Sequence, residues 1–258
     1  MVKPLEEDHM GEPHQDRNDW VRIFHPAPDA TRQLVCFPHA GGAASYYHAL
    51  SAALSPGTEV LVVQYPGREN RLFDEPIEAM DALADAAHRA LRPELAGRPV
   101  LFGHSMGAIV AFEVARRMEQ ADGPGPGLLV VSACPAPSRR VDTGVRLLGD
   151  DAILAEIMGL GGTDQGVGGH PELARLIMPA IRADLHAIET YRAEADATVH
   201  CPISVFVPDS DPKVTFAAAE SWRMHTTAGV DLQVFVGGHF YLGARPDEFL
   251  DRLLGVLA

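Results

Sequence analysis

A serine lies between two glycines in residues 103–107 (GHSMG), a pattern that can build a nucleophile. The pentapeptide follows the apolar run 99–102 (PVLF) and precedes a helical pattern, which is the context that this motif requires. At a sharp strand-to-helix turn the serine adopts a strained backbone, and side chains two positions before or after it would collide with neighbouring backbone. The N-terminal N–H groups of the following helix would lie where an oxyanion develops. We therefore expect Ser105 to be a nucleophile, the alternative being an ordinary turn with a capping serine.

The Ser105 hydroxyl needs a base to remove its proton during attack, and the chain offers twelve histidines. His239 belongs to residues 237–240 (GGHF), which follow the apparent last strand, so we expect it at the same end of the sheet as Ser105. Among the other histidines, His200 and His225 are expected at the surface. His104 is expected to point away from the serine at the sharp turn, and His186 could line a pocket from the insertion described below. The pattern predicts that His239 is the base.

An acid that orients the histidine is expected in residues 207–212 (VPDSDP), which follow another apolar strand. Asp209 and Asp211 compete for this role. Asp211 precedes Pro212, where the chain turns helical, so its side chain can stay fixed at the loop-to-helix junction. We expect Asp211 to orient the imidazole and Asp209 to form the turn.

Short apolar runs alternate with longer segments of helical spacing along most of the chain. The expected strands cover residues 20–24, 33–37, 59–63, 99–102, 128–132, 203–207 and 232–236. The expected helices cover residues 46–54, 79–95, 106–120, 216–225 and 247–256. Several strands are apolar throughout, as in parallel sheets that helices cover on both faces. The alternation predicts an α/β fold with a mostly parallel central sheet and right-handed crossovers.

Two segments depart from this rhythm. Residues 1–18 are polar and acidic and predict a loose tail, which leaves residues 19–258 as a single domain. Residues 139–191 contain no convincing strand and hold helical pieces at 150–158, 171–178 and 180–191, with a glycine-rich connection over 161–169. Such an insertion predicts a lid over a ligand site, and the glycines favour a mobile lid over a fixed decoration.

Composition and charge exclude several classes of function. The 258 residues include 47% hydrophobic and 22% charged residues, as in an ordinary globular protein. The net charge of −14 argues against binding to nucleic acid or to an anionic membrane, and no apolar run has the length of a membrane span. Histidine and cysteine spacings offer no metal site, and phosphate-binding loops are absent, so we expect neither metal nor cofactor. The N-terminus lacks the apolar core of a signal peptide, and three unpaired cysteines favour a reducing compartment with buried thiols, so we expect a cytoplasmic protein.

A second oxyanion donor is expected from the loop after strand 33–37, which reads FPHAGG over residues 37–42. This loop begins a series of motifs in one order, followed by 64–68 (QYPGR), 103–108 (GHSMGA), 209–212 (DSDP) and 237–240 (GGHF). With these motifs the chain closely resembles the type II thioesterases that serve polyketide synthases and non-ribosomal peptide synthetases. Residues 179–184 (PAIRAD), before 189–191 (ETY), also look like this family. The resemblance runs from about residue 34 to residue 242.

The resemblance implies an α/β-hydrolase fold in which Ser105, Asp211 and His239 form a catalytic triad, with the amides of Ala40 and Met106 as oxyanion donors. It also implies hydrolysis of acyl thioesters on the phosphopantetheine arm of a carrier protein, to remove stalled or mis-primed acyl groups or to release product. The lid is then the expected substrate-binding region. The family is often monomeric, so we expect a monomer. Proline precedes the first aspartate of the acid loop, where relatives often have glycine.

Two other functions fit the same motifs: a small-molecule carboxylesterase or lipase, and a catalytically inactive hydrolase fold used for binding. The intact serine, acid and histidine argue against the inactive fold. A carrier protein is usually acidic, as is this chain, so docking would require a local basic patch. Candidates for this patch are Arg68, Arg71, Arg116, Arg117, Arg139 and Arg140.

Overall fold

The computed structural model describes residues 18–121, 123–161, 171–194 and 196–258. Residues 1–17 of the expected tail and residues 162–169 of the glycine-rich connection lie outside the described part, so these two predictions are not tested. Asn18, the last residue of the expected tail, is anchored, because its side-chain amide donates to the carbonyl oxygen of Ala90 at 2.8 Å.

Seven strands form one sheet in the order β1-β3-β2-β4-β5-β6-β7, and all neighbours except β1 and β3 run parallel. The strands are β1 (Val21–Arg22), β2 (Gln33–Phe37), β3 (Glu59–Val63), β4 (Val100–His104), β5 (Leu128–Ser132), β6 (Ile203–Pro208) and β7 (Val230–Phe235). The central strands are almost wholly buried, since helices cover both of their faces. This arrangement confirms the predicted α/β class and the mostly parallel sheet.

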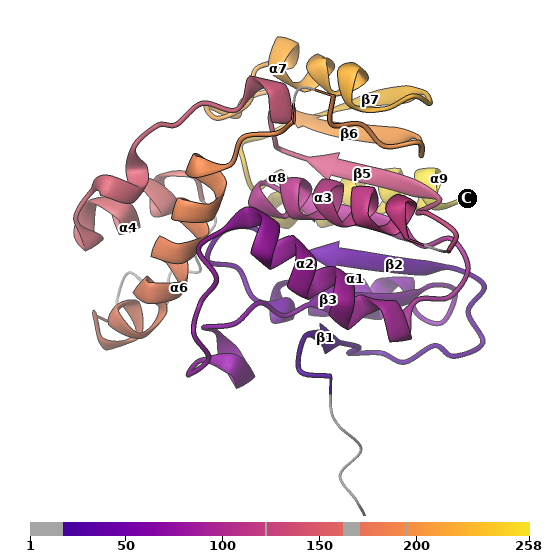
Figure 1. Ribbon diagram of the computed structural model, residues 1–258, viewed down its shortest axis with the longest axis horizontal. Helices are drawn as coiled ribbons and strands as arrows, with labels where there is room; N and C mark the ends of the chain where they lie inside the picture. Colours follow the sequence, from indigo (N-terminus) through magenta and orange to yellow (C-terminus); the bar gives the residue numbers. More distant parts are fainter. Residues whose placement is uncertain (1–17, 122, 162–170, 195) are drawn as a thin grey trace, which may run out of the picture.

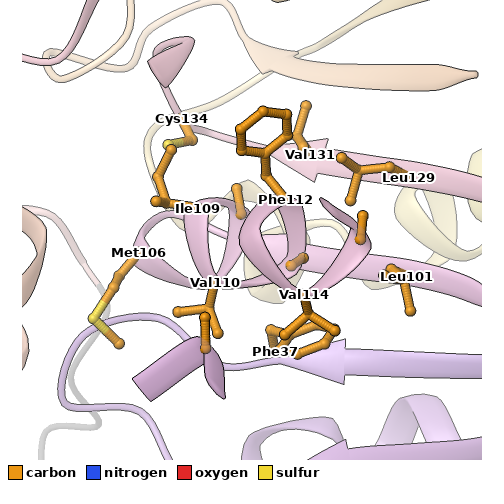
Figure 2. Packing of buried hydrophobic residues seen from close by; sticks show 14 of the residues in the cluster. Phe37, Leu101, Met106, Ile109, Val110, Phe112, Val114, Leu129, Val131 and Cys134 are labelled. Atoms are coloured by element: carbon orange, nitrogen blue, oxygen red, sulfur yellow. The ribbon is translucent and has the colours of Figure 1, made fainter. Parts of the chain in front are cut away.

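Helices cover each face of the sheet (Figure 1). On one face lie α2 (Met80–Leu91) and α3 (Met106–Gln120), and on the other lie α1 (His48–Leu54) and α9 (Pro246–Leu257). Alternate strand residues enter the two hydrophobic cores, as expected from the period of two along a strand. Figure 2 shows α3 packed on the sheet, with Val110 and Phe112 among the side chains between the helix and its neighbours. This packing fixes the start of α3 against the ends of the strands.

The insertion between β5 and β6 lies beyond the carboxyl ends of the strands, as Figure 1 shows at the left. It contains α4 (Asp150–Gly159) and α6 (Pro171–Thr190), which share a small hydrophobic core around Ile153, Met178 and Ile181. The sequence predicted two or three helical pieces in the insertion, and the ranges 171–178 and 180–191 prove to be one helix, because α6 continues through Pro179. Proline has a helical φ, and buried Met178 and Ile181 on either side pack into the same core, which offsets the lost N–H.

Other differences concern the ends of elements. The expected helices 46–54, 79–95 and 216–225 each include a short 3-10 segment, observed at Ala44–Tyr47, Arg92–Glu94 and Ser221–His225. Of the expected helix 216–225, only Phe216–Glu220 is α-helical, and it forms α7. A short helix that was not expected, α8 (Tyr241–Ala244), follows β7. Among the described residues, no helix has both the length and the apolar character needed to cross a membrane.

Candidate active site

The turn between β4 and α3 holds Ser105 in a strained conformation, with φ of 54° and ψ of −120°. A Cβ atom on Gly103 would lie 2.2 Å from the carbonyl oxygen of Gly107, and a Cβ atom on Gly107 would lie 2.0 Å from that of Phe37. Both distances are far below any tolerated contact. The expectation that only glycine fits two positions before and after the serine is confirmed.

Three side chains predicted for the site meet at the carboxyl end of the sheet. Ser105 follows β4, Asp211 follows β6 and His239 follows β7. The Nε2 atom of His239 lies 3.0 Å from the Oγ atom of Ser105, and its Nδ1 atom lies 2.7 Å from Oδ2 of Asp211. Because the carboxylate accepts the Nδ1 proton, Nε2 is left to accept the proton of the serine hydroxyl. The arrangement can therefore activate an alcohol for attack on a carbonyl carbon.

The two aspartates of the acid loop have different contacts. The side chain of Asp211 is buried, and its second oxygen accepts the N–H of Lys213 at 2.8 Å, so both carboxylate oxygens are held. Asp209 is exposed and accepts the N–H of Gly237 at 3.0 Å and the hydroxyl of Ser210 at 2.9 Å. These backbone and hydroxyl contacts lower the pKa of Asp209. Asp211 thus contacts the histidine, and Asp209 ties the loop after β6 to the loop after β7.

Two backbone amides can face the reacting carbonyl. Ala40 and Met106, the predicted oxyanion donors, line the same cavity as Ser105 and His239. Met106 is the first residue of α3, where the N–H groups have no partner within the helix. Ala40, in the loop after β2, and Met106, at the start of α3, therefore remain the candidate oxyanion donors.

Two neutral histidines pack beneath the site. The Nδ1 atom of His104 lies 2.9 Å from the hydroxyl of Ser132, so His104 does not approach the serine as a base. Burial, with smaller electrostatic contributions from neighbouring groups, lowers the pKa of His39 to about 3 and that of His104 well below its usual value. Both imidazoles are uncharged at neutral pH and form the rigid packing around His239, whose ring lies 5.2 Å from that of His104.

Two expectations about other histidines were wrong. His225 is buried rather than at the surface, since its Nδ1 donates to the carbonyl of Ala197 at 2.8 Å and its Nε2 accepts from Ser138. These contacts satisfy both ring nitrogens, which allows the polar ring to be buried. His186 is exposed and contacts the carbonyl of Glu78, so it does not line the pocket. The expectation that His200 is exposed is confirmed.

A cavity of about 380 Å³ lies above Ser105 and beneath the lid. Its wall from the insertion is largely apolar and includes Val145, Ile157, Leu160, Leu185 and Ile188. Charged side chains on the wall are mostly paired. Glu156 binds Lys213, and Glu189 accepts hydrogen bonds from Thr143, Arg146 and two backbone N–H groups. The expected lid therefore supplies much of the cavity wall.

The six arginines considered for docking have different environments. Arg68 is buried and pairs with Asp184, so its assignment to a surface patch was wrong. Three others pair with carboxylates, namely Arg71, Arg116 and Arg117. Only Arg139 and Arg140 line the cavity, and neither has a carboxylate within 4.0 Å among the described residues. Arg139 and Arg140 therefore remain the candidates for the basic docking patch.

The cysteines are free and buried, as expected, and burial raises the pKa of Cys134 to about 11 and that of Cys201 to about 12. In the described part of the chain, no group of three or more histidine, cysteine, aspartate or glutamate side chains could hold a metal ion. The thiols are therefore packing groups rather than nucleophiles.

Comparisons with known proteins agree with this geometry. A family model described as "Thioesterase domain" matches residues 32–256. "Thioesterase PikA5" of Streptomyces venezuelae is 45% identical over 239 residues, which cover 92% of this chain and 85% of that protein. A "Probable cadicidin biosynthesis thioesterase" of Streptomyces griseus is 46% identical over 88% of this chain, and the match spans 63% of that relative, less than two thirds of its length.

Among solved structures, the type II thioesterase BorB from the borrelidin biosynthetic cluster superposes with a TM-score of 0.86. The two chains are 46% identical, and the match covers 93% of this chain and 98% of BorB. The fold is thus the α/β-hydrolase fold that the motifs predicted. With a family model that spans most of its length, the chain belongs to the thioesterase family.

Proposed function

We propose that this protein is a serine thioesterase that hydrolyses acyl groups from the phosphopantetheine arm of carrier proteins in polyketide or non-ribosomal peptide biosynthesis. Membership in the thioesterase family makes the chain a thioester hydrolase. The observation that carries the serine mechanism is the hydrogen-bonded row from Ser105 through His239 to Asp211 at the floor of the cavity. The similarity to BorB and to PikA5 supports the carrier-bound substrate.

The first half-reaction acylates the enzyme. His239 accepts the proton of Ser105 through Nε2 while the serine oxygen attacks the thioester carbonyl carbon. The amides of Ala40 and Met106 donate to the oxyanion that forms. When the tetrahedral intermediate collapses, the carbon–sulfur bond breaks, and the pantetheine sulfur either takes the proton from His239 or leaves as a thiolate. In the second case His239 gives its proton to solvent before water attacks.

The second half-reaction releases the acyl group. Water gives a proton to Nε2 of His239 as its oxygen attacks the acyl-serine, and the same amides hold the second oxyanion. Collapse breaks the bond to Ser105, which recovers its proton from His239, and a carboxylic acid leaves. Asp211 stays ionised throughout and stabilises the imidazolium. The Ser105 proton leaves with the thiol and a proton of the attacking water replaces it, so the steps balance with these residues and water alone.

The cavity supports a substrate with an apolar acyl group and a long arm. Its lid wall is largely apolar, whereas Arg139 and Arg140 offer positive charge on the same wall. Arg139 donates to the hydroxyl of Ser221 at 3.1 Å, and Arg140 donates to the carbonyl of Ile188 at 3.2 Å. We place the approach of an acidic carrier on this side, because the other arginines considered for docking pair with carboxylates.

Covalent labelling tests the nucleophile. A fluorophosphonate should add one adduct to the wild-type protein, detected by intact-mass measurement, and none to Ser105→Ala. The variant should lose about 10⁴-fold or more in kcat, as other enzymes do when the nucleophile of a triad is removed. An adduct that persists on Ser105→Ala would refute the assignment.

Substrate comparison tests the carrier-bound thioester. The ratio of kcat/KM for an acyl-carrier protein to that for a p-nitrophenyl ester of the same acyl group should clearly exceed one. A ratio below one would favour a small-molecule carboxylesterase with the same triad. A panel of carrier-bound acyl groups of increasing length would then define which acyl groups the cavity accepts.

A further inference from the structure

A buried carboxylate of the lid touches the loop that carries the Ala40 amide. Asp184, on α6, is 1% exposed, and its Oδ2 atom accepts the N–H of Gly41 at 2.8 Å. Its Oδ1 atom accepts from Nη2 of Arg68 at 2.9 Å. Arg68 is 5% exposed, and its Nη1 atom donates to the carbonyl of Gly42 at 3.2 Å. One ion pair therefore holds both an N–H and a C=O of the loop after β2.

The ion pair is itself anchored to the sheet. Gln64, which follows β3, is fully buried, and its side-chain nitrogen donates to the carbonyl of Arg68 at 3.0 Å. Its side-chain oxygen accepts the N–H of Ala44 at 2.7 Å, at the far end of the same loop. The Arg68 guanidinium also lies 5.2 Å from the centre of the Tyr65 ring. These contacts fix the cation on the sheet side, and Asp184 is the partner that the lid supplies.

Hydrogen bonds account for two of the three amides over residues 40–42. Asp184 occupies the N–H of Gly41, and the carbonyl of His39 occupies the N–H of Gly42 at 2.9 Å. Over residues 40–42, the N–H of Ala40 is the one that donates to no described residue. A carboxylate left close to an oxyanion would repel it, but the charge of Asp184 is neutralised by Arg68. The pair thus leaves one donor available without opposing the developing charge.

The lid also packs directly on the loop. Gly41 has a φ of 72°, and a Cβ atom there would lie 3.0 Å from the side chain of Ile181 on α6. Asp184 and Ile181 are three positions apart, so they lie on the same face of the helix. A displacement of α6 therefore changes the surroundings of Gly41 through both a hydrogen bond and a packing contact.

We propose that Asp184, together with Arg68, is a positioning residue that orients the Ala40 amide and makes oxyanion stabilisation depend on the position of lid helix α6. The inference rests on the proposed serine mechanism and extends it, because it assigns to the lid a part in acyl transfer besides covering the substrate. Neither side chain lines the cavity above Ser105. Their effect is expected in the transition state, where a correctly aimed donor is worth most.

Graded substitutions at Asp184 test the proposal. Asp184→Asn keeps an acceptor for Gly41 but loses the charge that holds Arg68, and kcat should fall about 10-fold. Asp184→Ala loses both contacts, and kcat should fall about 100-fold, which is within the range known for loss of one oxyanion donor. KM for an acyl-pantetheine thioester should change less than about 3-fold. The matched control is Asp150→Asn, which removes an exposed ion pair to Arg182 of α6 far from the loop and should leave kcat unchanged.

A transition-state analogue separates positioning from general damage. A trifluoromethyl ketone analogue of the substrate becomes an oxyanion when Ser105 adds to it, so its affinity should fall by the same factor as kcat. Thermal melting and circular dichroism establish that each variant is folded. If Asp184→Ala does not fold because Arg68 is left unpaired, the kcat and the analogue affinity of Asp184→Asn test the positioning role.

The outcomes distinguish this inference from the proposed function. If the wild-type protein neither hydrolyses the thioester nor reacts with a fluorophosphonate, the proposed function fails. If the wild type is active and a folded Asp184→Asn variant keeps both kcat and analogue affinity within 2-fold, the positioning role is wrong. A fall in kcat with unchanged analogue affinity would also overturn it, because the defect would then lie outside the oxyanion hole.

Discussion

The buried imidazole of His39 should make stability depend on pH. His39 lies directly before the Ala40 donor, is 7% exposed, and packs against the rings of Tyr46 and Phe240 at centroid distances of 4.9 and 4.8 Å. Its Nδ1 atom has no hydrogen-bond partner among the described residues. Burial, then electrostatic interaction with His239 and Arg68, lowers its pKa from 6.5 to about 3. The native protein therefore keeps this ring neutral.

The direction of the effect follows from proton binding. Below pH 6.5 the unfolded chain protonates His39, whereas the native chain does not until the pH approaches about 3. The free energy of unfolding therefore falls as the pH falls through this window, and the contribution is fully present above pH 6.5. Each pH unit in the window corresponds to about 1.4 kcal/mol. Lowering the pH from 7.5 to 5.0 should cost about 2 kcal/mol through His39 alone.

Urea unfolding of the wild type and of His39→Leu at pH 7.5 and pH 5.0 measures this contribution. Leucine fills part of the same space without titrating, so the variant should lose about 2 kcal/mol less than the wild type over the interval. The absolute stability of the variant does not enter the comparison. The pKa of His104 is also lowered by burial, so both proteins keep a residual dependence on pH. Equal losses in the two proteins would show that His39 is not held neutral by its surroundings.

Two further predictions concern the turn and the acid. Gly107→Ala should lower Tm by at least several degrees and kcat/KM at least 10-fold, because its Cβ atom would lie 2.0 Å from the carbonyl oxygen of Phe37. The control is Gly229→Ala, whose Cβ atom would meet nothing within 4 Å. Equal melting curves for the two variants would contradict this prediction. Asp211→Asn should lower kcat about 10⁴-fold by favouring the wrong imidazole tautomer. Asp209→Asn, which keeps an acceptor for the loop after β7, should lower kcat less than 10-fold, and a reversed order in steady-state assays would assign the acid to Asp209.

Much of the sheet could be predicted from the sequence, because strands buried on both faces leave continuous apolar runs. The runs 33–37, 59–63 and 128–132 coincide with β2, β3 and β5. The sequence left open whether α6 is one piece or two, and only the shared core of the lid shows why the helix continues through Pro179. The ends of elements were less accurate, since 3-10 segments have no separate pattern of apolar residues.

The candidate triad could be located because its members follow strands, and the carboxyl ends of parallel strands meet at one edge. The positioning pair could not be derived in this way. Asp184 and Arg68 are 116 positions apart, and neither follows a strand directly or has a spacing that indicates its partner. The only signal was that both lie in segments, 64–68 and 179–184, that resemble the thioesterase family. The burial of His225 was missed for the same reason, since Ser138 is 87 positions away.

The contacts of the lid argue that it belongs to the catalytic site. On one side of Ser105, α6 holds the loop of the oxyanion donor through Asp184. On the other side, Glu156 of α4 binds the ammonium group of Lys213, whose backbone N–H holds Asp211. The two lid helices share one small core, so a rigid displacement of the lid would disturb the donor and the acid together. We therefore expect an acyl group that displaces the lid to lose kcat and not only affinity, which kcat and KM measured over a series of acyl lengths would show.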